Sequence, residues 1–190
     1  MSEQAIKKIL ITGANGFIGG SLMRYYQNQG QDVVGVDLVG NGDDIVEGDI
    51  SQPNSIKQLL TESDVIIHTA ALVSNAMQDS DMWRVNVLAT RNLIQAAKEH
   101  KVRRFVQISS IVAYGNSAEG EIDENHPVHA DGGSYVLTKL ASEHVVLSEQ
   151  ANDDIEVVII RPGDAYGPGS RPWIIAPLEA IAKNQFMLPE

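Results

Sequence analysis

Apolar runs alternate with amphipathic segments along the 190 residues of the chain. Five of the runs are rich in Val and Ile, and most of them lack the polar–apolar alternation of a half-exposed strand. Such runs are typical of parallel strands that are covered on both faces. We therefore predict strands over residues 6–12, 32–37, 64–69, 103–109 and 155–161, with a weaker one over 44–47.

Helical patterns fill the segments between these strands. After the first strand, Ile18 and Leu22 fall on one helical face. Apolar stripes, or a proline suited to a first turn, predict further helices over residues 53–60, 79–99 and 134–150. Strands and helices in this order predict an α/β protein with a doubly wound parallel sheet and right-handed crossovers.

Two segments depart from this alternation. Residues 115–133 form a connection much longer than the usual length of about 4–6 residues. We interpret it either as a substrate-facing loop after a central strand or as a disordered surface insertion. Residues 171–190 contain the start of another amphipathic helix without a closing strand, so we expect the natural protein to be longer than this chain.

A glycine-rich stretch, TGANGFIG, stands where the first predicted strand becomes a helix. Backbone N–H groups without neighbouring Cβ atoms, at the positive end of a helix, bind phosphate groups. We expect Gly13 to make the turn, Gly16 to let a diphosphate approach and Gly19 to let the helix pack against the first strand. A plain tight turn is the alternative, because the spacing is G-x-x-G-x-x-G rather than G-x-G-x-x-G.

Acidic residues follow the next two predicted strands. Asp37 lies about 20 residues past the glycines, where a carboxylate accepts hydrogen bonds from both hydroxyls of an adenosine ribose. Its charge would repel a 2′-phosphate and no arginine lies beside it, which favours NAD over NADP. Asp49 is interpreted either as a partner of the adenine amine or as a helix cap before Ser51 and Pro53.

A candidate for proton transfer is the pair Tyr135 and Lys139, which lie four residues apart on one face of a predicted helix. A phenol has an ordinary pKa near 10, and lowering it by about 3 pH units requires roughly 4 kcal/mol of preferential stabilisation of the phenolate. A neighbouring ammonium and a cationic nicotinamide would together provide this. Ser110 follows a central strand at the edge where ligands bind, so it can orient a substrate alcohol or carbonyl. Ser109 competes for that role.

Composition and charge exclude several classes of function. The chain has no cysteine, which excludes disulfides, thiolate metal sites and thiol catalysis. A net charge of −11 argues against a nucleic-acid partner. No apolar run approaches the roughly 20 residues that span a bilayer, and the first residues lack the apolar core of a secretion signal. We therefore expect a cytoplasmic protein without a membrane partner.

His68 and the remaining motifs point to no further chemistry. His68 ends an apolar strand, and we interpret it as a structural histidine satisfied in the core. The sequence shows no His, Asp and Glu grouping with metal-ligand spacing, so no metal site is predicted. A serine hydrolase would need a G-x-S-x-G elbow, and a P-loop would need G-K-[ST] after the glycines. Both are absent from the sequence.

Taken together, these pieces resemble the extended short-chain dehydrogenase/reductase family, which includes the NAD-dependent epimerases and dehydratases. The resemblance covers nearly the whole chain through the motifs TGANGFIG, VDL, GDI, HTAA, VNVLATRNLIQAA, ISSIVAYG, YVLTK and RPGDAYGPG, in this order. It implies a Rossmann fold, bound NAD(P) and a Ser–Tyr–Lys catalytic set. By the same resemblance, residues 1–170 form the NAD-binding domain, and residues 171–190 start a substrate-binding region that lies largely outside this chain.

The resemblance also implies roles for individual residues. Tyr135 would be the general acid/base, Lys139 would hold the nicotinamide ribose and lower the tyrosine pKa, and Ser110 would be the catalytic hydroxyl residue. Asn86 would order the backbone near the cofactor. The full set of implied cofactor contacts is Gly13, Asn15, Gly16, Phe17, Ile18, Gly19, Asp37, Leu38, Asp49, Ile50, Thr69, Ala70, Ala71, Asn86, Tyr135, Lys139 and Pro162.

Departures from the family pattern narrow the expected function. Sugar-nucleotide 4,6-dehydratases of the family carry an acidic pair where Ile111 and Val112 follow Ser110 here, which disfavours dehydration. The stretches YVLTKLASE and RPWII are similar to the 3β-hydroxysteroid dehydrogenase and dihydroflavonol reductase branches, and they fit sugar-nucleotide epimerases loosely.

We expect an NAD-dependent dehydrogenase or epimerase that acts on a secondary alcohol or ketone of a small molecule, such as a sugar nucleotide or a hydroxysteroid. A non-catalytic dinucleotide sensor on the same fold is the alternative. Relatives of this kind often dimerise through two helices, which implies a homodimer through residues 79–99 and 134–150.

Overall fold

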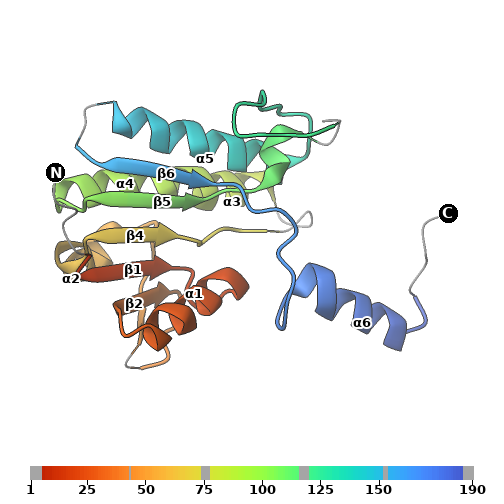
Figure 1. Ribbon diagram of the computed structural model, residues 1–190, viewed down its shortest axis with the longest axis horizontal. Coiled ribbons are helices and arrows are strands. Elements are labelled where there is room, and N and C mark those ends of the chain that lie inside the picture. Colours follow the sequence, from red (N-terminus) through yellow and green to blue (C-terminus); the bar gives the residue numbers. More distant parts are fainter. Residues whose placement is uncertain (1–5, 43, 74–77, 116–119, 152–153, 186–190) are drawn as a thin grey trace.

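A computed structural model describes residues 6–42, 44–73, 78–115, 120–151 and 154–185. Within these residues the centre is a six-stranded, all-parallel sheet in the order β3-β2-β1-β4-β5-β6 (Figure 1). The strands are β1 Lys8–Thr12, β2 Asp32–Asp37, β3 Ile45–Glu47, β4 Val65–His68, β5 Arg104–Ile108 and β6 Glu156–Ile160. The strand order reverses at β1, so the predicted doubly wound fold is confirmed.

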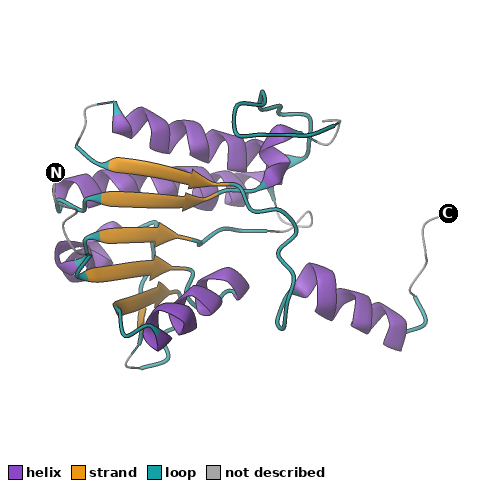
Figure 2. Ribbon diagram, viewed as in Figure 1, coloured by secondary structure: helices purple, strands orange, loops and turns teal. Residues whose placement is uncertain are grey.

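Helices lie on both faces of this sheet (Figure 2). The α-helices are α1 Phe17–Asn28, α2 Lys57–Glu62, α3 Asp79–Trp83, α4 Thr90–Glu99, α5 Ser134–Gln150 and α6 Ala176–Ala182. Shorter helical turns are the 3-10 turns η1 Pro53–Ile56 and η3 Ile111–Tyr114 and the π-helical turns η2 Arg84–Ala89 and η4 Arg171–Ile175.

Each strand contributes to two apolar cores because successive side chains point to opposite faces of the sheet. On one face, Leu10, Ile66 and Phe105 pack with residues of α2, α4 and α5. On the other face, Ile11 and Ile67 pack with residues of α1. Each large side chain buried in this way contributes about 1.5–3 kcal/mol. This double burial is why the strands have continuous apolar sequences.

The helical segment over residues 79–99 is irregular where the sequence predicts a regular helix. It runs from α3 to α4 through η2. Asn86, within η2, turns its side chain to the backbone of Leu72 and accepts a hydrogen bond on its carbonyl oxygen from the Thr90 hydroxyl at 2.9 Å. A π-helical turn often marks a functional position in a helix.

The long connection and the last helix lie at the edges of the fold. Residues 120–133 contain neither helix nor strand, and the His129 N–H donates to the Ala113 carbonyl oxygen at 3.0 Å. Helix α6 projects away from the sheet and buries none of its residues (Figure 1). Across the described part of the chain, every helix is too short or too polar to cross a bilayer.

Candidate active site

The glycine-rich turn joins β1 to α1 at the carboxyl edge of the sheet. Gly13 has φ +69°, and a Cβ there would lie 2.7 Å from the Ala70 backbone. A Cβ on Gly19 would lie 2.2 Å from the Gly13 carbonyl oxygen, so the helix packs against the turn only because residue 19 is glycine. Gly16 is the N-cap of α1, and no side chain caps the helix. The first N–H groups of α1 are therefore available to a ligand.

A cavity of about 240 Å³ lies beside this turn. Its lining combines the glycine turn with the ends of β2, β3 and β4, and it comprises Gly13, Gly16, Val36, Asp37, Leu38, Gly48, Asp49, Ile50, Thr69, Ala70, Ala71, Leu72 and Val85. Most of the predicted cofactor contacts outside the catalytic helix are in this group. Val36, Gly48, Leu72 and Val85 were not predicted, because an apolar or glycine lining position has no sequence signal of its own.

Asp37 lies at the end of β2, where its carboxylate faces the glycine turn. Its Oδ2 accepts from the Asn15 N–H at 2.9 Å and its Oδ1 accepts from the Leu38 N–H at 2.8 Å. A carboxylate has about four acceptor positions, so two are still available for the hydroxyls of a ribose. Asp37 therefore supports the turn and lines the cavity at the same time.

Asp49 makes the hydrogen bond expected of a cap and also lines the cavity, so the role of an adenine partner stays a prediction. Its Oδ1 accepts from the Ser51 N–H at 2.8 Å, as expected for a cap, and its side chain lines the cavity. Hydrogen bonds from the Ser51 side chain and backbone hold the pKa of Asp49 below its usual value. The residue is ionised at neutral pH and can accept a hydrogen bond from an amine.

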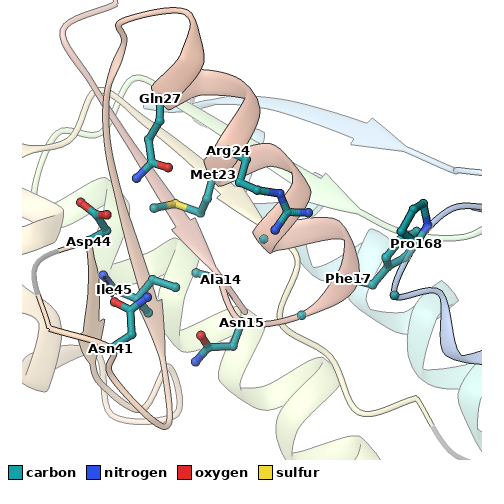
Figure 3. A pocket seen from close by; sticks show the side chains of 13 residues that line it. Ala14, Asn15, Phe17, Met23, Arg24, Gln27, Asn41, Asp44, Ile45 and Pro168 are labelled. Atoms are coloured by element: carbon teal, nitrogen blue, oxygen red, sulfur yellow. Dashed lines mark hydrogen bonds between the residues drawn. The ribbon is translucent and has the colours of Figure 1, made fainter. Parts of the chain in front are cut away.

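A second hollow, of about 420 Å³, borders the glycine turn and α1 (Figure 3). Asn15, Phe17, Arg24 and Asp44 line it together with Pro168 from the segment after β6. The Asn15 Nδ2 donates to the Val39 carbonyl oxygen at 2.7 Å, which links the turn to the segment after β2. No predicted catalytic residue lines this hollow. Asn15 and Phe17, both predicted cofactor contacts, line this second hollow and not the cavity that contains Asp37.

The predicted catalytic residues converge from α5 and the end of β5. Lys139 is buried, its Nζ donates to the Ile108 carbonyl oxygen at 2.8 Å, and the same Nζ lies 6.0 Å from the centre of the Tyr135 ring. Ser110 precedes η3, where its hydroxyl oxygen accepts from the Val112 N–H at 3.3 Å, and its side chain lies close enough to Tyr135 to lower the pKa of that phenol. Ser109 instead donates to the buried Glu143 carboxylate. Ser110 is therefore the serine that faces the tyrosine.

Burial dominates the electrostatics of Tyr135 and Lys139. It raises the pKa of Tyr135, and the nearby Ser110 side chain offsets this only in part. Burial also lowers the pKa of Lys139 to about 8, against an opposing effect of Glu143.

Asn86 orders the backbone beside the cavity, as its resemblance to the family motif implies. Its Oδ1 accepts from the Leu72 N–H at 2.7 Å and its Nδ2 donates to the Leu72 carbonyl oxygen at 3.0 Å. The same Nδ2 donates to the Thr138 hydroxyl at 3.1 Å. Asn86 thereby connects the strand end after β4 to the catalytic helix.

His68 is a satisfied core residue, as predicted. Its Nε2 lies 2.9 Å from the Thr90 hydroxyl, and its Nδ1 lies 2.6 Å from the Thr12 hydroxyl. Because the Thr90 hydroxyl already donates to the Asn86 carbonyl oxygen, Nε2 carries the proton and Nδ1 accepts from Thr12. Burial and the Lys139 charge lower the pKa of His68 to about 3, so the ring is neutral at pH 7.

This histidine makes folding stability depend on pH. The unfolded chain takes up a proton as the pH falls below about 6.5, whereas the folded protein does not until about pH 3. The free energy of unfolding should therefore be about 2–3 kcal/mol lower at pH 4.5 than at pH 7.0 through His68 alone. Urea unfolding at pH 7.0 and pH 4.5 measures the loss, and His68→Gln should be less stable at pH 7.0 but lack this share of the pH dependence. An equal loss in both proteins would contradict the assignment.

The comparisons with known proteins agree with this geometry. The model of the NAD dependent epimerase/dehydratase family matches residues 9–184. The chain belongs to this family. Its membership confirms the predicted resemblance to the extended short-chain dehydrogenases/reductases and the Rossmann fold.

Several known proteins are similar over most of this chain. UDP-glucose 4-epimerase of Vibrio cholerae is 31% identical over 190 residues, which cover 94% of this chain and 58% of that protein. Sterol demethylase protein B of Methylococcus capsulatus is 34% identical over 174 residues, which cover 84% and 52%. The chain thus spans less than two thirds of the length of these relatives.

A solved structure has the same architecture. MoeE5 in complex with UDP-glucuronic acid and NAD superposes with a TM-score of 0.82 at 33% identity, over 91% of this chain and 60% of that one. The sheet and the flanking helices described above therefore form the arrangement found in MoeE5.

Proposed function

We propose that this chain binds NAD at the glycine turn and carries the catalytic set of an oxidoreductase or epimerase. The observation that carries the proposal is the convergence of Ser110, Tyr135 and Lys139 at the carboxyl edge of the sheet, beside a turn that excludes Cβ atoms. The residues present fit the cofactor. The free N–H groups of α1 suit a diphosphate, and the Asp37 carboxylate suits a ribose.

The chemistry follows from the positions of these side chains. NAD, when bound, supplies the hydride acceptor for the carbon that bears a secondary hydroxyl group. Tyr135 takes the hydroxyl proton, Ser110 orients the hydroxyl oxygen, and Lys139 stabilises the phenolate while it holds the nicotinamide ribose. In an epimerase, Tyr135 would first take the hydroxyl proton during oxidation and then return it to the carbonyl oxygen during reduction, in which the hydride would return to the opposite face of the carbon.

Titration calorimetry with NAD and NADH tests the cofactor assignment directly. We expect saturable binding at one site per chain. The absence of binding by the folded chain would overturn the proposal. Binding without turnover of any alcohol by the full-length protein would instead favour the non-catalytic sensor.

The preference for NAD over NADP should depend on Asp37. Replacing Asp37 by alanine should weaken NADH binding by about tenfold or more. It should also narrow the difference in affinity between NADH and NADPH, because the repulsion of a 2′-phosphate is lost. Calorimetry with both dinucleotides measures the two affinities. Asp32→Ala is the matched control, since Asp32 is exposed at the opposite end of the same strand. An unchanged NADH to NADPH ratio in Asp37→Ala would contradict the role of Asp37.

We further propose a sugar nucleotide as the substrate class. UDP-glucuronic acid in the MoeE5 structure and the epimerase activity named for the Vibrio cholerae relative support this class over a hydroxysteroid. Ile111 and Val112, which follow Ser110, offer no acid for elimination, so dehydrogenation or epimerisation is favoured over dehydration. NADH formation with UDP-sugars by the full-length protein tests this class.

Two organisational proposals complete this interpretation. Residues 1–170 act as the NAD-binding domain, and residues 171–190, with the projecting α6, begin the substrate-binding region. We also propose a homodimer through the segment from α3 to α4 and through α5. Exposed apolar side chains support it: Trp83 and Leu88 on the first segment, and Leu137 and Leu147 on α5. Sedimentation equilibrium tests the dimer.

A further inference from the structure

A buried ionic cluster joins the chain segments that carry the catalytic set. Glu143 lies one turn after Lys139 on α5 and is 2% exposed. Its Oε1 accepts from the Arg161 Nε at 3.0 Å and from the Ser109 hydroxyl, and its Oε2 accepts from the Arg161 Nη2 at 2.8 Å. This two-pronged geometry is the strong form of an arginine–carboxylate pair.

Each partner of Glu143 is adjacent to the catalytic serine turn. Ser109 directly precedes Ser110. The Arg161 Nη1 donates to the Tyr114 hydroxyl at 2.9 Å, and the guanidinium lies 4.7 Å from the centre of that ring. Tyr114 ends η3, the turn that Ser110 begins. One carboxylate on the catalytic helix therefore contacts, directly or through Arg161, both ends of the segment that presents the Ser110 hydroxyl.

Glu143 also lies one helical turn from the buried Lys139, which is 4% exposed, on the same face of α5. Burial lowers the pKa of this lysine to about 8, and Glu143 opposes the effect. The other groups around the ammonium supply no anion: the His68 ring from β4 is neutral, Tyr135 is a neutral phenol, and Arg161 from β6 is a cation behind the carboxylate. Among the described residues, the opposing charge thus comes from Glu143.

We propose that Glu143 is a positioning residue of this site: held by Arg161 and Ser109, its carboxylate fixes the Ser110 turn against the catalytic helix and supplies the counter-charge that keeps the buried Lys139 protonated. This inference rests on the proposed function, which assigns Tyr135 and Lys139 to proton transfer. It adds a requirement that the catalytic trio alone does not contain.

The test is a pH titration of the lysine side chains in the chain without added cofactor, monitored by NMR of ¹³C-labelled lysine. The Lys139→Met variant identifies the Lys139 signal. In the wild-type chain its midpoint should lie near pH 8. Glu143→Gln should lower the midpoint by about one pH unit, because the anion that faces the ammonium is gone. Glu149→Gln is the matched control. It removes another carboxylate of α5, one that pairs with Lys98 of α4, and it should leave the Lys139 midpoint unchanged.

The alternative is a role for Glu143 in folding stability alone. In that case Glu143→Gln lowers the thermal midpoint while the Lys139 titration stays at its wild-type pH, and the proposal is overturned. If the single variant does not fold, Glu143→Gln with Arg161→Met removes both ions together, a change that buried pairs often tolerate. The Lys139 midpoint should fall in this double variant as well, and an unchanged midpoint would again overturn the proposal.

The readout separates this inference from the proposed function because the titration needs no cofactor and no substrate. Failure to bind NAD would remove the enzymatic role but leave the Lys139 midpoints as measured. Normal NAD binding with an unchanged midpoint in Glu143→Gln would instead retain the proposed function and reject the role of Glu143.

Discussion

Tyr135→Phe is expected to lower turnover by the full-length protein by about 100-fold or more while leaving NADH affinity unchanged. The substitution removes the one oxygen that takes the substrate proton, but the glycine turn and Asp37, which would bind the cofactor, lie on other elements. Steady-state kinetics with a sugar nucleotide and calorimetry with NADH measure the two effects. Tyr25→Phe, which removes an exposed hydroxyl on α1, is the control and should behave as wild type.

Near-normal turnover in Tyr135→Phe would reject the tyrosine as the proton acceptor. Burial raises the pKa of Tyr135. We therefore expect the phenol to become acidic only when a bound cation joins Lys139, so activity should rise with pH until the phenolate forms.

Gly19→Ala should abolish detectable NAD binding and destabilise the fold by about 1–3 kcal/mol. The new methyl group would lie 2.2 Å from the Gly13 carbonyl oxygen and 2.8 Å from the Thr69 hydroxyl, so either the turn or the helix must move. Movement of either one displaces the N–H groups that would face a diphosphate. Urea unfolding and calorimetry with NADH measure the two losses.

Gly20→Ala provides the adjacent control for this substitution. Its methyl group would lie 3.2 Å from the Ala14 carbonyl oxygen, a close contact offset by the gain of about 1 kcal/mol in helix propensity. We expect stability within about 1 kcal/mol of wild type and retained NADH binding. Equal behaviour of the two alanine variants would show that the close approach at Gly19 is not what shapes the phosphate site.

The fold could be predicted from the sequence because its determinants are local. Each strand is an apolar run buried on both faces, and every predicted strand matches an observed one to within two residues at either end. The glycine turn is equally local, since the steric demands at Gly13 and Gly19 arise within one strand–helix junction. Ser110, Tyr135 and Lys139 lie in short motifs, so they could be named before their convergence was visible.

The parts that could not be predicted depend on contacts between distant segments. Glu143 lies 34 residues from Ser109 and 18 from Arg161, and nothing in a single helix pattern distinguishes it from a solvent-exposed glutamate. The π-helical turn at Asn86 has the same origin, because it accompanies a hydrogen-bonded contact with Leu72 on another segment. The raised pKa of Tyr135 reflects three-dimensional burial, which the pattern of a single helix does not reveal.

The hydrogen bond from the Asn15 backbone to Asp37 has a consequence for redesign of the coenzyme preference. A substitution meant to admit NADP would remove an acceptor that also steadies the loop carrying Asn15 and Gly16. The preference for NAD over NADP and the affinity for either dinucleotide thus both depend on the Asp37 side chain. A successful exchange needs a second change that restores an acceptor for that amide, or the engineered protein will gain tolerance of the extra phosphate and lose its hold on both dinucleotides.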